Sequence, residues 1–262
     1  PDTYWSFRHA IKFISKKSAS MPLGIITVSA MLPGDWEKKV VDMNIQVLKD
    51  RDILWADHVY VSAMSVQSQS ADEIIKRVQE LGKKVVAGGP HFTGNPENYS
   101  HVDHLILNEA ELSFPGFLND LTDGRAARVY SSSEFAEMSS SPVPDYHLID
   151  VRKYAQLSIQ YSRGCPHDCE FCEITALLGR KVRTKDSAQI ILELDNIYST
   201  GYRGSIFFVD DNFIGNKNKL KRDLLPKIIT WNNIHSMPFS FNTEASIDLA
   251  DDEELMDMMT KA

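Results

Sequence analysis

The chain has 262 residues, of which 43% are hydrophobic and 24% are charged, and its 28 basic and 36 acidic side chains give a net charge of −8. This length allows two domains with cores of useful size, and the acidic balance disfavours nucleic acid as the main partner. No apolar run approaches the roughly 18 residues that cross a bilayer. With no secretory signal and no paired cysteines, we expect a cytoplasmic protein without a transmembrane segment.

Strand-like and helix-like segments alternate through the first half of the chain. The predicted helices cover residues 25–32, 71–81 and 114–121, and the predicted strands cover 39–43, 57–64, 84–87 and 104–107. Strands that alternate with helices indicate a parallel, doubly wound sheet. Such sheets bind ligands at the carboxyl ends of their strands, and serine, glycine and acidic residues follow the strands here.

A glycine pair, Gly88 and Gly89, ends the third of these predicted strands. Glycine at this place is explained by a tight turn, and equally by the close approach of the backbone to a bulky ligand. The pair alone does not decide between the two interpretations.

Serine and proline cluster between the two halves of the chain, at 131–133 and 139–144. Such clusters are typical of loops. We therefore divide the chain into a first domain at 1–128, a linker at 129–155 and a second domain at 156–262.

All three cysteines, Cys165, Cys169 and Cys172, lie in the short run 165–172, directly after the strand-like segment 157–161. An odd number of closely spaced thiols is a poor disulfide framework, whereas crowded thiolates usually hold a soft metal or a cluster. Iron–sulfur clusters normally take four cysteines, so three leave one iron of a four-iron cluster open to a small molecule. Zinc, with His167 or a distant residue as fourth ligand, is the alternative. A shared helix face is disfavoured because proline follows the first cysteine.

Three strand–helix units follow from residue 157 onward. The predicted strands cover 157–161, 205–209 and 239–242, and the predicted helices cover 187–199, 217–233 and 251–262. Successive parallel strands joined by helical crossovers build a barrel, with catalytic residues at the carboxyl ends of the strands. Cys165, Asp210 and Glu244 all fall at such ends.

The C-x3-C-x-aromatic-C spacing of the cysteine run resembles the radical S-adenosylmethionine (SAM) superfamily. Three further stretches resemble its cobalamin-dependent branch, and within that branch the hopanoid methylases and the bacteriochlorophyllide methyltransferases. These stretches lie at residues 171–183, 208–216 and 242–246. The resemblance covers essentially the whole chain.

The resemblance implies an α/β chain with a Rossmann-like, doubly wound cobalamin-binding domain, followed by the first half of a radical SAM (βα)6 partial TIM barrel. Such a barrel normally has six strand–helix units, and the sequence offers three. The cobalamin domain normally opens with a strand, and no apolar run precedes 4–8. We therefore expect a fragment that lacks its first strand and is truncated in the barrel, where an open strand edge needs a cover.

The resemblance also implies the ligands of three cofactors. Cys165, Cys169 and Cys172 would hold a [4Fe–4S] cluster. The implied SAM contacts are Phe171, Asp210, Asp211, Asn242, Glu244 and Arg183. The implied cobalamin contacts are Ser62, Ser65, Gly88, Gly89, Pro90, Asn108 and Glu109.

Several of these assignments have a plainer explanation. Asp211 and Asn212 suit the N-cap of the following helix, and Arg183 suits a solvated surface. The D-x-H-x-x-G string, which supplies a lower axial histidine to cobalt in many cobalamin proteins, does not occur, so we expect no histidine on the lower face of cobalt. His91 is the nearest candidate for such a cobalt ligand. We favour the interpretation that it is a turn histidine whose side chain is hydrogen-bonded to backbone.

The implied function is a C-methyltransferase that methylates an unactivated carbon through a 5′-deoxyadenosyl radical and methylcobalamin. We expect a small, low-polarity substrate and an electron donor such as flavodoxin or ferredoxin. One alternative is an anaerobic oxidative cyclase acting on magnesium protoporphyrin monomethyl ester, which uses the same cofactors without methyl transfer. A non-catalytic corrinoid-binding module with a zinc site is the other.

Overall fold

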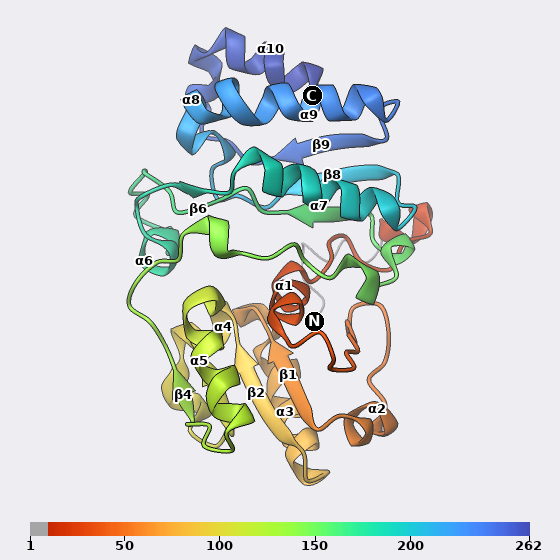
Figure 1. Ribbon diagram of the computed structural model, residues 1–262, viewed down its shortest axis with the longest axis vertical. Helices are drawn as coiled ribbons and strands as arrows, with labels where there is room; N and C mark the ends of the chain where they lie inside the picture. The colour runs from red at the N-terminus through yellow and green to blue at the C-terminus, as the bar shows by residue number, and fades with distance from the viewer. Residues whose placement is uncertain (1–9) are drawn as a thin grey trace. The chain divides into compact units, whose positions relative to one another are not determined.

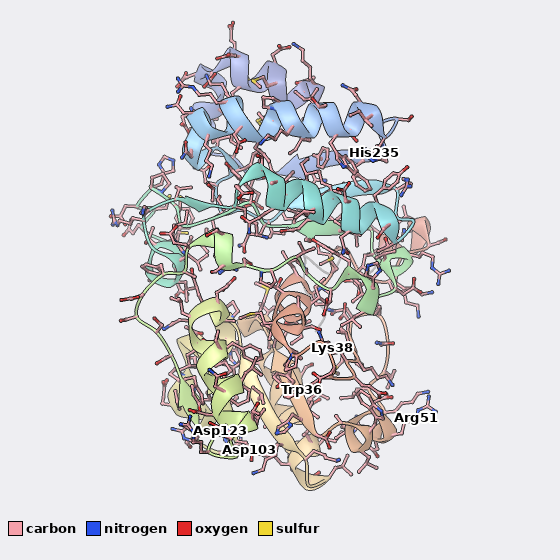
Figure 2. The ribbon with its side chains drawn as sticks, viewed as in Figure 1. Trp36, Lys38, Arg51, Asp103, Asp123 and His235 are labelled. Carbon is pink, nitrogen blue, oxygen red and sulfur yellow. The ribbon has the colours of Figure 1, made fainter. Side chains whose placement is uncertain are left out.

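The computed structural model describes residues 10–262 and divides into two compact units (Figure 1), and Figure 2 adds the side chains to the same view. One unit comprises residues 24–136, and the other comprises 11–23 together with 137–262. The linker predicted at 129–155 is therefore shared between the two units. The predicted absence of an opening strand concerns residues 1–9, which lie outside the described residues.

The first unit is built on a parallel sheet with the strand order β1-β2-β3-β4. Its strands are β1 (His58–Ser62), β2 (Lys84–Gly88), β3 (His104–Ile106) and β4 (Val129–Tyr130). Ser62 pairs with Gly88, and Gly88 pairs with Ile106. This register brings the carboxyl ends of the first three strands level at one edge of the sheet.

Side chains alternate between the two faces of this sheet, as strand geometry requires. Val85, Ala87 and Leu105 pack in one core cluster with α3 (Ser68–Glu80). Val86 and Ile106 pack in another with α5 (Ala110–Thr122) and α1 (Leu23–Met31). The strands are thus covered by helices on both faces, which is the doubly wound arrangement that the sequence predicts.

One predicted strand of this unit is wrong. Residues 39–43 form no strand and lead into a turn in which the Asp42 carboxylate accepts hydrogen bonds from the backbone and side-chain amides of Asn44. Aspartate and asparagine favour such local bonds over a strand ladder. The short α2 (Asp50–Trp55), α4 (Pro90–Gly94) and β4 were not predicted.

The second unit contains a parallel sheet with the order β5-β8-β9. Its strands are β5 (Gln156–Ile159), β8 (Gly204–Phe208) and β9 (Phe239–Thr243). The connecting helix α7 (Ser187–Ser199) has the predicted bounds, and α10 (Glu253–Lys261) follows β9. Three parallel strands with helical connections agree with the first half of a barrel.

The helix predicted at 217–233 is present with a widened turn inside it. It runs from α8 (Lys217–Lys219) through a π-helical turn (Leu220–Leu224) into α9 (Leu225–Ile234). Pro226 lacks the backbone N–H that would continue the α-helical ladder, and the π turn lies directly before it. Asn216 caps this helix by accepting from the backbone N–H of Lys219.

Much of the predicted linker packs in the second unit. The Gln189 side chain of α7 donates to the carbonyl oxygens of Met138, Ser139 and Ser141. The Tyr146 hydroxyl donates to the carbonyl of Ser158 in β5. These bonds make 137–155 part of the second unit and not a free tether.

The fold class predicted from the sequence is confirmed: an α/β chain whose first sheet is parallel and Rossmann-like. Among the residues that the structure describes, no helix combines the length and apolar character that a bilayer crossing needs.

Candidate functional site

The first part of the candidate site is the carboxyl edge of the first sheet. Ser62 ends β1, Gly88 ends β2, and Asn108 follows β3. Beyond β1 the chain exposes Met64 and Val66, which are 62% and 63% accessible. Exposed apolar side chains beside serine and asparagine suit a large ligand with apolar faces and a polar rim.

Gly88 and Gly89 are required by the packing of the chain itself. A Cβ atom on Gly88 would lie 2.8 Å from the carbonyl oxygen of Ile106 in the neighbouring strand. Gly89 has φ +97°, and a Cβ there would lie 2.9 Å from the Ser62 hydroxyl. Turn and packing geometry therefore account for both glycines, and the bare backbone that results lies at the carboxyl edge.

Asn108 and Glu109 fix the chain after β3. Asn108 adopts φ +62°, a region that asparagine tolerates better than most residues. Its side-chain amide donates to the carbonyl of Ser132. Glu109 is buried, and one carboxylate oxygen accepts from the backbone N–H of Ala136. Glu109 thus anchors 132–136, whereas Asn108 stays exposed at the edge.

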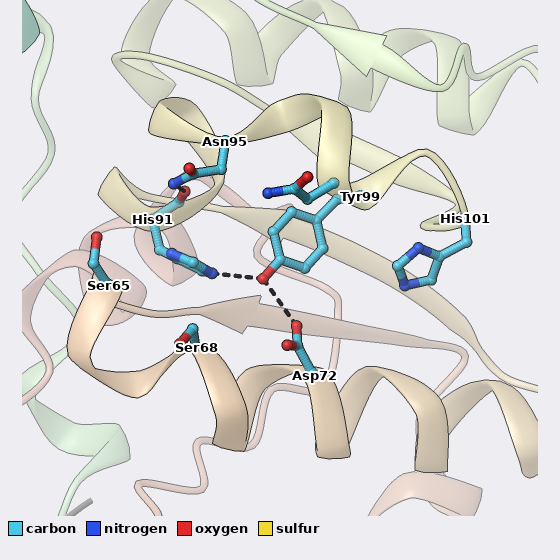
Figure 3. Close-up of a pocket in the computed structure, with 8 residues that line it drawn as sticks. Ser65, Ser68, Asp72, His91, Asn95, Tyr99 and His101 are labelled. Carbon is cyan, nitrogen blue, oxygen red and sulfur yellow. Dashed lines mark hydrogen bonds between the residues drawn. The ribbon is translucent and has the colours of Figure 1, made fainter.

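A polar pocket of about 430 Å³ adjoins this edge on the side of α3 and α4 (Figure 3). Its lining residues are Ser65, Ser68, Asp72, His91, Asn95, Asn98, Tyr99 and His101. Only Ser65 among them was predicted as a cobalamin contact.

His91, Tyr99 and Asp72 form a hydrogen-bond chain in this pocket, drawn in Figure 3. Tyr99 donates to Asp72 over 2.8 Å, and its oxygen lies 2.5 Å from His91 Nε2. Burial, together with the hydrogen bond to Asp72, raises the pKa of Tyr99 to about 12, so the hydroxyl keeps its proton. His91 Nε2 is therefore the donor to Tyr99, and Nδ1 is buried without a hydrogen-bond partner among the described residues.

The second part of the candidate site is the cysteine loop, which follows β5. Its base is a two-residue antiparallel ladder between β6 (Ser162–Arg163) and β7 (Arg183–Thr184), and α6 (Ile174–Leu178) lies within it. The N–H of Cys165 donates to the carbonyl of Gly179. Gly164 has φ +88°, and a Cβ on it would lie 2.5 Å from the carbonyl oxygen of Lys181.

Within this loop the three thiols are free and only partly buried. Cys169 is exposed, and Cys165 and Cys172 are half-buried. Among residues 10–262, no three histidine, cysteine, aspartate or glutamate side chains are brought together as a metal site. Metal ligands are commonly gathered by the ion that they bind, so the assignment rests on the donor set: three thiols on one short loop at a strand end. Phe171, at the aromatic position, is 91% exposed.

Three polar residues at the end of β8 have different surroundings. Asp210 is buried, and it accepts from the backbone N–H groups of Tyr161 and Ser162 and from the Ser162 hydroxyl. Asp211 has a carboxylate oxygen, Oδ2, that is buried and has no hydrogen-bond partner in the described chain. Asn212 exchanges hydrogen bonds with Ser246 beyond β9.

These surroundings distinguish Asp210 from Asp211. Both Asp210 oxygens accept hydrogen bonds from the chain, so this carboxylate is already engaged by protein donors. Burial is the largest cause that raises the pKa of Asp211, nearby Glu244 adds to it, and Arg163 opposes it. Asn212 is the N-cap residue of the short 3-10 helix Phe213–Asn216, but its side chain makes no capping hydrogen bond there; α8 is capped by Asn216. An orphaned carboxylate oxygen at a strand end fits an ammonium donor.

The remaining predicted SAM contacts are less closely gathered. Asn242 and Glu244 are exposed, and the Asn242 amide donates to Ser205 Oγ across the sheet over 2.6 Å. Arg183 is 5% exposed and donates to the carbonyl of Leu178. A solvated surface position for Arg183 is therefore wrong. It holds the far side of the cysteine loop.

Sequence reasoning missed Ser162, and it considered Arg180 only as a contact of the SAM carboxylate and not as a partner of Asp168. Ser162 gives two of the three donors to Asp210, and Arg180 pairs with Asp168 at 2.5 Å across the cysteine loop. A serine beside a strand end carries no signal of its own. The opposite charges of Asp168 and Arg180 within one loop could have suggested their pairing.

Comparison with known proteins shows what the chain is similar to. Residues 14–118 match the family model of the B12 binding domain. Two solved enzymes share the fold. Cobalamin-dependent S-adenosylmethionine radical enzyme OxsB superposes with a TM-score of 0.68 at 16% identity, over 88% of this chain and 37% of that one. Radical S-adenosylmethionine methyltransferase TsrM from Kitasatospora setae gives 0.66 at 17%, over 83% and 49%.

Sequence relatives are more specific. The chain is 44% identical to an uncharacterised methyltransferase of Synechocystis over 100% of its length and 49% of the relative. It is 36% identical to the hopanoid C-2 methylase of Rhodopseudomonas palustris, over 99% and 50%, and 25% identical to a bacteriochlorophyllide d methyltransferase of Chlorobaculum tepidum, over 78% and 48%. The predicted resemblance is thus confirmed: the chain is related to these methylases and spans about half the length of each.

Proposed function

We propose that the full protein is a cobalamin-dependent radical SAM C-methyltransferase, which methylates an unactivated carbon of a small, low-polarity molecule. One observation carries the proposal. A three-cysteine loop leaves the end of β5 beside β8, whose end presents the buried, unpartnered oxygen of Asp211. The B12-binding domain and the relatives that are named methylases favour methyl transfer over ring closure.

Each residue set has a proposed task. Cys165, Cys169 and Cys172 would hold a [4Fe–4S] cluster and leave one iron for the amino and carboxylate groups of SAM. Asp211 would accept a hydrogen bond from the SAM ammonium. Phe171, Asn242, Glu244 and Arg183 stay proposed SAM contacts.

Cobalamin would lie at the carboxyl edge of the first sheet, as ligands of doubly wound sheets do. The contacts that we propose there are Ser62, Ser65, Gly88, Gly89, Pro90 and Asn108. Glu109, predicted as a further contact, would act by anchoring 132–136 beneath that edge. Bound together, these cofactors supply a radical that abstracts hydrogen and a transferable methyl group, while the protein positions them.

The electron donor, such as a flavodoxin or ferredoxin, and the cytoplasmic location stay predictions. The boundaries 1–128, 129–155 and 156–262 also stay proposals for the functional domains. The contacts of 137–155 suggest that the second domain begins earlier than proposed.

The first experiment is metal analysis of the full-length protein, purified without oxygen. Iron, sulfide, zinc and cobalt are quantified for the wild type and for a Cys165→Ala, Cys169→Ala, Cys172→Ala variant. We expect about four irons and matching sulfide per chain in the wild type, lost in the variant, with cobalt retained in both. Zinc without sulfide would refute the radical mechanism and favour a corrinoid-binding module.

A second experiment addresses Asp211. The Asp211→Asn variant should bind SAM at least about tenfold more weakly, because a charge-assisted hydrogen bond to the ammonium is lost. Equilibrium dialysis with labelled SAM measures this affinity. Asp195→Asn is the matched control. Asp195 makes the same substitution possible outside the candidate SAM site, because its carboxylate accepts from the indole of Trp231. Equal SAM affinity in both variants would refute the assignment.

A further inference from the structure

The end of β8 carries three consecutive polar residues, Asp210, Asp211 and Asn212, with different partners. The outer two residues bond only to protein: Asp210 to the turn after β5, and Asn212 to Ser246 after β9. The middle residue keeps the unpartnered carboxylate oxygen. A single short segment thus contacts both neighbouring strand ends and leaves one side chain for a ligand.

The turn that Asp210 binds is the entrance to the cysteine loop. Tyr161 and Ser162 donate their backbone N–H groups to the two carboxylate oxygens, and the Ser162 hydroxyl adds a third donor. Ser162 also pairs with Thr184 in the ladder that closes the base of the loop. Cys165 lies three residues further on. The position of Ser162 therefore sets where the first thiol leaves the sheet.

Because Asp210 is buried, the loss of any of these hydrogen bonds is costly. The side chain is 2% exposed, so water cannot replace a lost partner, and an unsatisfied donor or acceptor there is costly. A surface carboxylate with the same partners would have little control over the turn.

We propose that Asp210 is a positioning residue for the cysteine loop, which fixes Tyr161 and Ser162 so that Cys165 is held beside Asp211. The inference rests on the proposed function, because it gives the loop the task of holding a cluster. Asp210 itself contacts neither SAM nor cluster in this account. It acts through the backbone of the β5 turn, and so differs from its predicted role as a SAM contact.

The test compares Asp210→Asn with Ser162→Ala and a control. Asparagine keeps the size of the side chain but turns an amide N–H₂ toward the backbone donors. Ser162→Ala removes only the hydroxyl donor. Asp186→Asn is the control, because Asp186 also accepts from a backbone N–H, at the start of α7, and lies outside the loop.

Two readouts are taken on the full-length protein. Hydrogen exchange of peptides that cover 161–165 and 179–184 is measured without cluster. Iron and sulfide content, and the change that SAM makes in the electron paramagnetic resonance spectrum of the reduced cluster, are measured after reconstitution. In Asp210→Asn we expect loop exchange to rise about tenfold, as the loss of one buried hydrogen bond implies, with less cluster and a weakened SAM response. Ser162→Ala should change in the same direction by less.

The outcomes separate this inference from the proposed function. Wild-type protein without iron would refute the cluster, while the exchange experiment would still test the positioning role. Normal iron in the wild type, with loop exchange and SAM response unchanged in Asp210→Asn, would overturn the positioning role alone. The positioning role would also be overturned if Asp210→Asn and Asp186→Asn showed the same rise in loop exchange and the same loss of cluster. Both variants would then reflect general destabilisation. If Asp210→Asn does not fold, Ser162→Ala carries the test.

Discussion

Gly164 packs against Lys181 so closely that a Cβ atom on the glycine would lie 2.5 Å from the lysine carbonyl oxygen. The carbonyls of Gly179 and Leu178 would lie at 3.0 and 3.1 Å. These atoms are all backbone, so they cannot move aside as a flexible side chain can. The two ends of the cysteine loop can close on each other only when residue 164 has no side chain.

Gly164→Ala should therefore open the base of the cysteine loop. We expect a cost of about 2–5 kcal/mol, from the positive φ and the steric overlap together, and a loss of bound iron. Gly201→Ala is the matched control, because Gly201 has φ +80° but nothing within 4 Å of its Cβ position. It should cost only about 1 kcal/mol and keep its iron. Iron content and the thermal midpoint are measured for both full-length variants. An equal loss of iron in the two variants would contradict the steric argument.

Gly88 and Gly89 allow a similar comparison at the candidate cobalamin edge. Gly88→Ala would push β2 away from the Ile106 carbonyl, and Gly89→Ala would strain a residue at φ +97°. Each should weaken cobalamin binding by about tenfold or more, because overlaps of this kind cost about 1–3 kcal/mol and act on the edge itself. The Kd is measured by absorbance titration.

Gly82→Ala is the control for this pair. Gly82 has φ +71° and open space around its Cβ position, and it lies before β2, at the opposite end of that strand. Its substitution should lower the thermal midpoint slightly and leave the Kd for cobalamin unchanged. A Kd that rises equally in all three variants would mean that general destabilisation, and not the carboxyl edge, controls binding.

Short apolar runs bounded by turn residues were enough to predict most strands of the fold. The strands at 84–88 and 204–208 are short, apolar and bounded by turn residues, so their local pattern and their tertiary role agree. The segment at 39–43 has a similar apolar character, but Asp42 uses its carboxylate in a local turn. Nothing in the local pattern distinguishes such a side-chain bond from a ladder bond.

Part of the candidate site could likewise be predicted from the sequence, and part depends on the fold. The cysteines can be recognised from spacing alone, because three thiols so close together have few other uses. Asp210 and Asp211 are adjacent and chemically identical in the sequence, yet one is engaged by backbone donors and the other has a free oxygen. That difference depends on where Ser162, 48 residues away, lies in the fold.

His91 should not be a ligand of cobalt. Its Nε2 donates to Tyr99, and its Nδ1 is buried, so neither nitrogen is directed to the open edge without breaking this arrangement. His91→Gln should leave the visible spectrum and the cob(II)alamin resonance spectrum of bound cobalamin like those of the wild type. His101→Gln, in the same pocket, is the control. A nitrogen coupling that disappears only in His91→Gln would show that histidine does bind cobalt.

Lys185 and Glu193 form a buried ion pair in the second unit, with side chains 3% and 1% exposed. Removing Lys185 alone leaves a buried charge without compensation, so Lys185→Met should cost on the order of 3–5 kcal/mol. The double variant Lys185→Met, Glu193→Leu should recover most of this loss. Lys261→Met, in an exposed pair with Asp257, should cost less than about 0.5 kcal/mol. Urea midpoints of the full-length variants measure these differences, and a double variant as unstable as Lys185→Met would contradict the expectation.

Asp210 should also make stability depend on pH. Burial raises the pKa of Asp210 to about 7, against the hydrogen bonds from Ser162 and Tyr161 that lower it, and Asp211 adds to the rise. The folded protein then keeps this proton up to about pH 7, whereas the unfolded chain loses it near pH 4. The folded state binds more protons in that window, so the stability that Asp210 contributes falls as pH rises through it and is constant above.

Asparagine does not titrate, so the wild type should exceed Asp210→Asn in thermal midpoint most near pH 4, and by less as pH approaches 7. Midpoints of both cluster-free proteins at steps between about pH 4.5 and pH 8 span the window set by the two pKa values. Asp248→Asn is the control: Lys217 lowers the pKa of Asp248 to about 2, so its contribution is lost only below that window, and its difference from the wild type should be flat. A flat difference for Asp210→Asn as well, or one that grows with pH, would show that the buried carboxylate is already ionised at low pH because its three donors outweigh its burial.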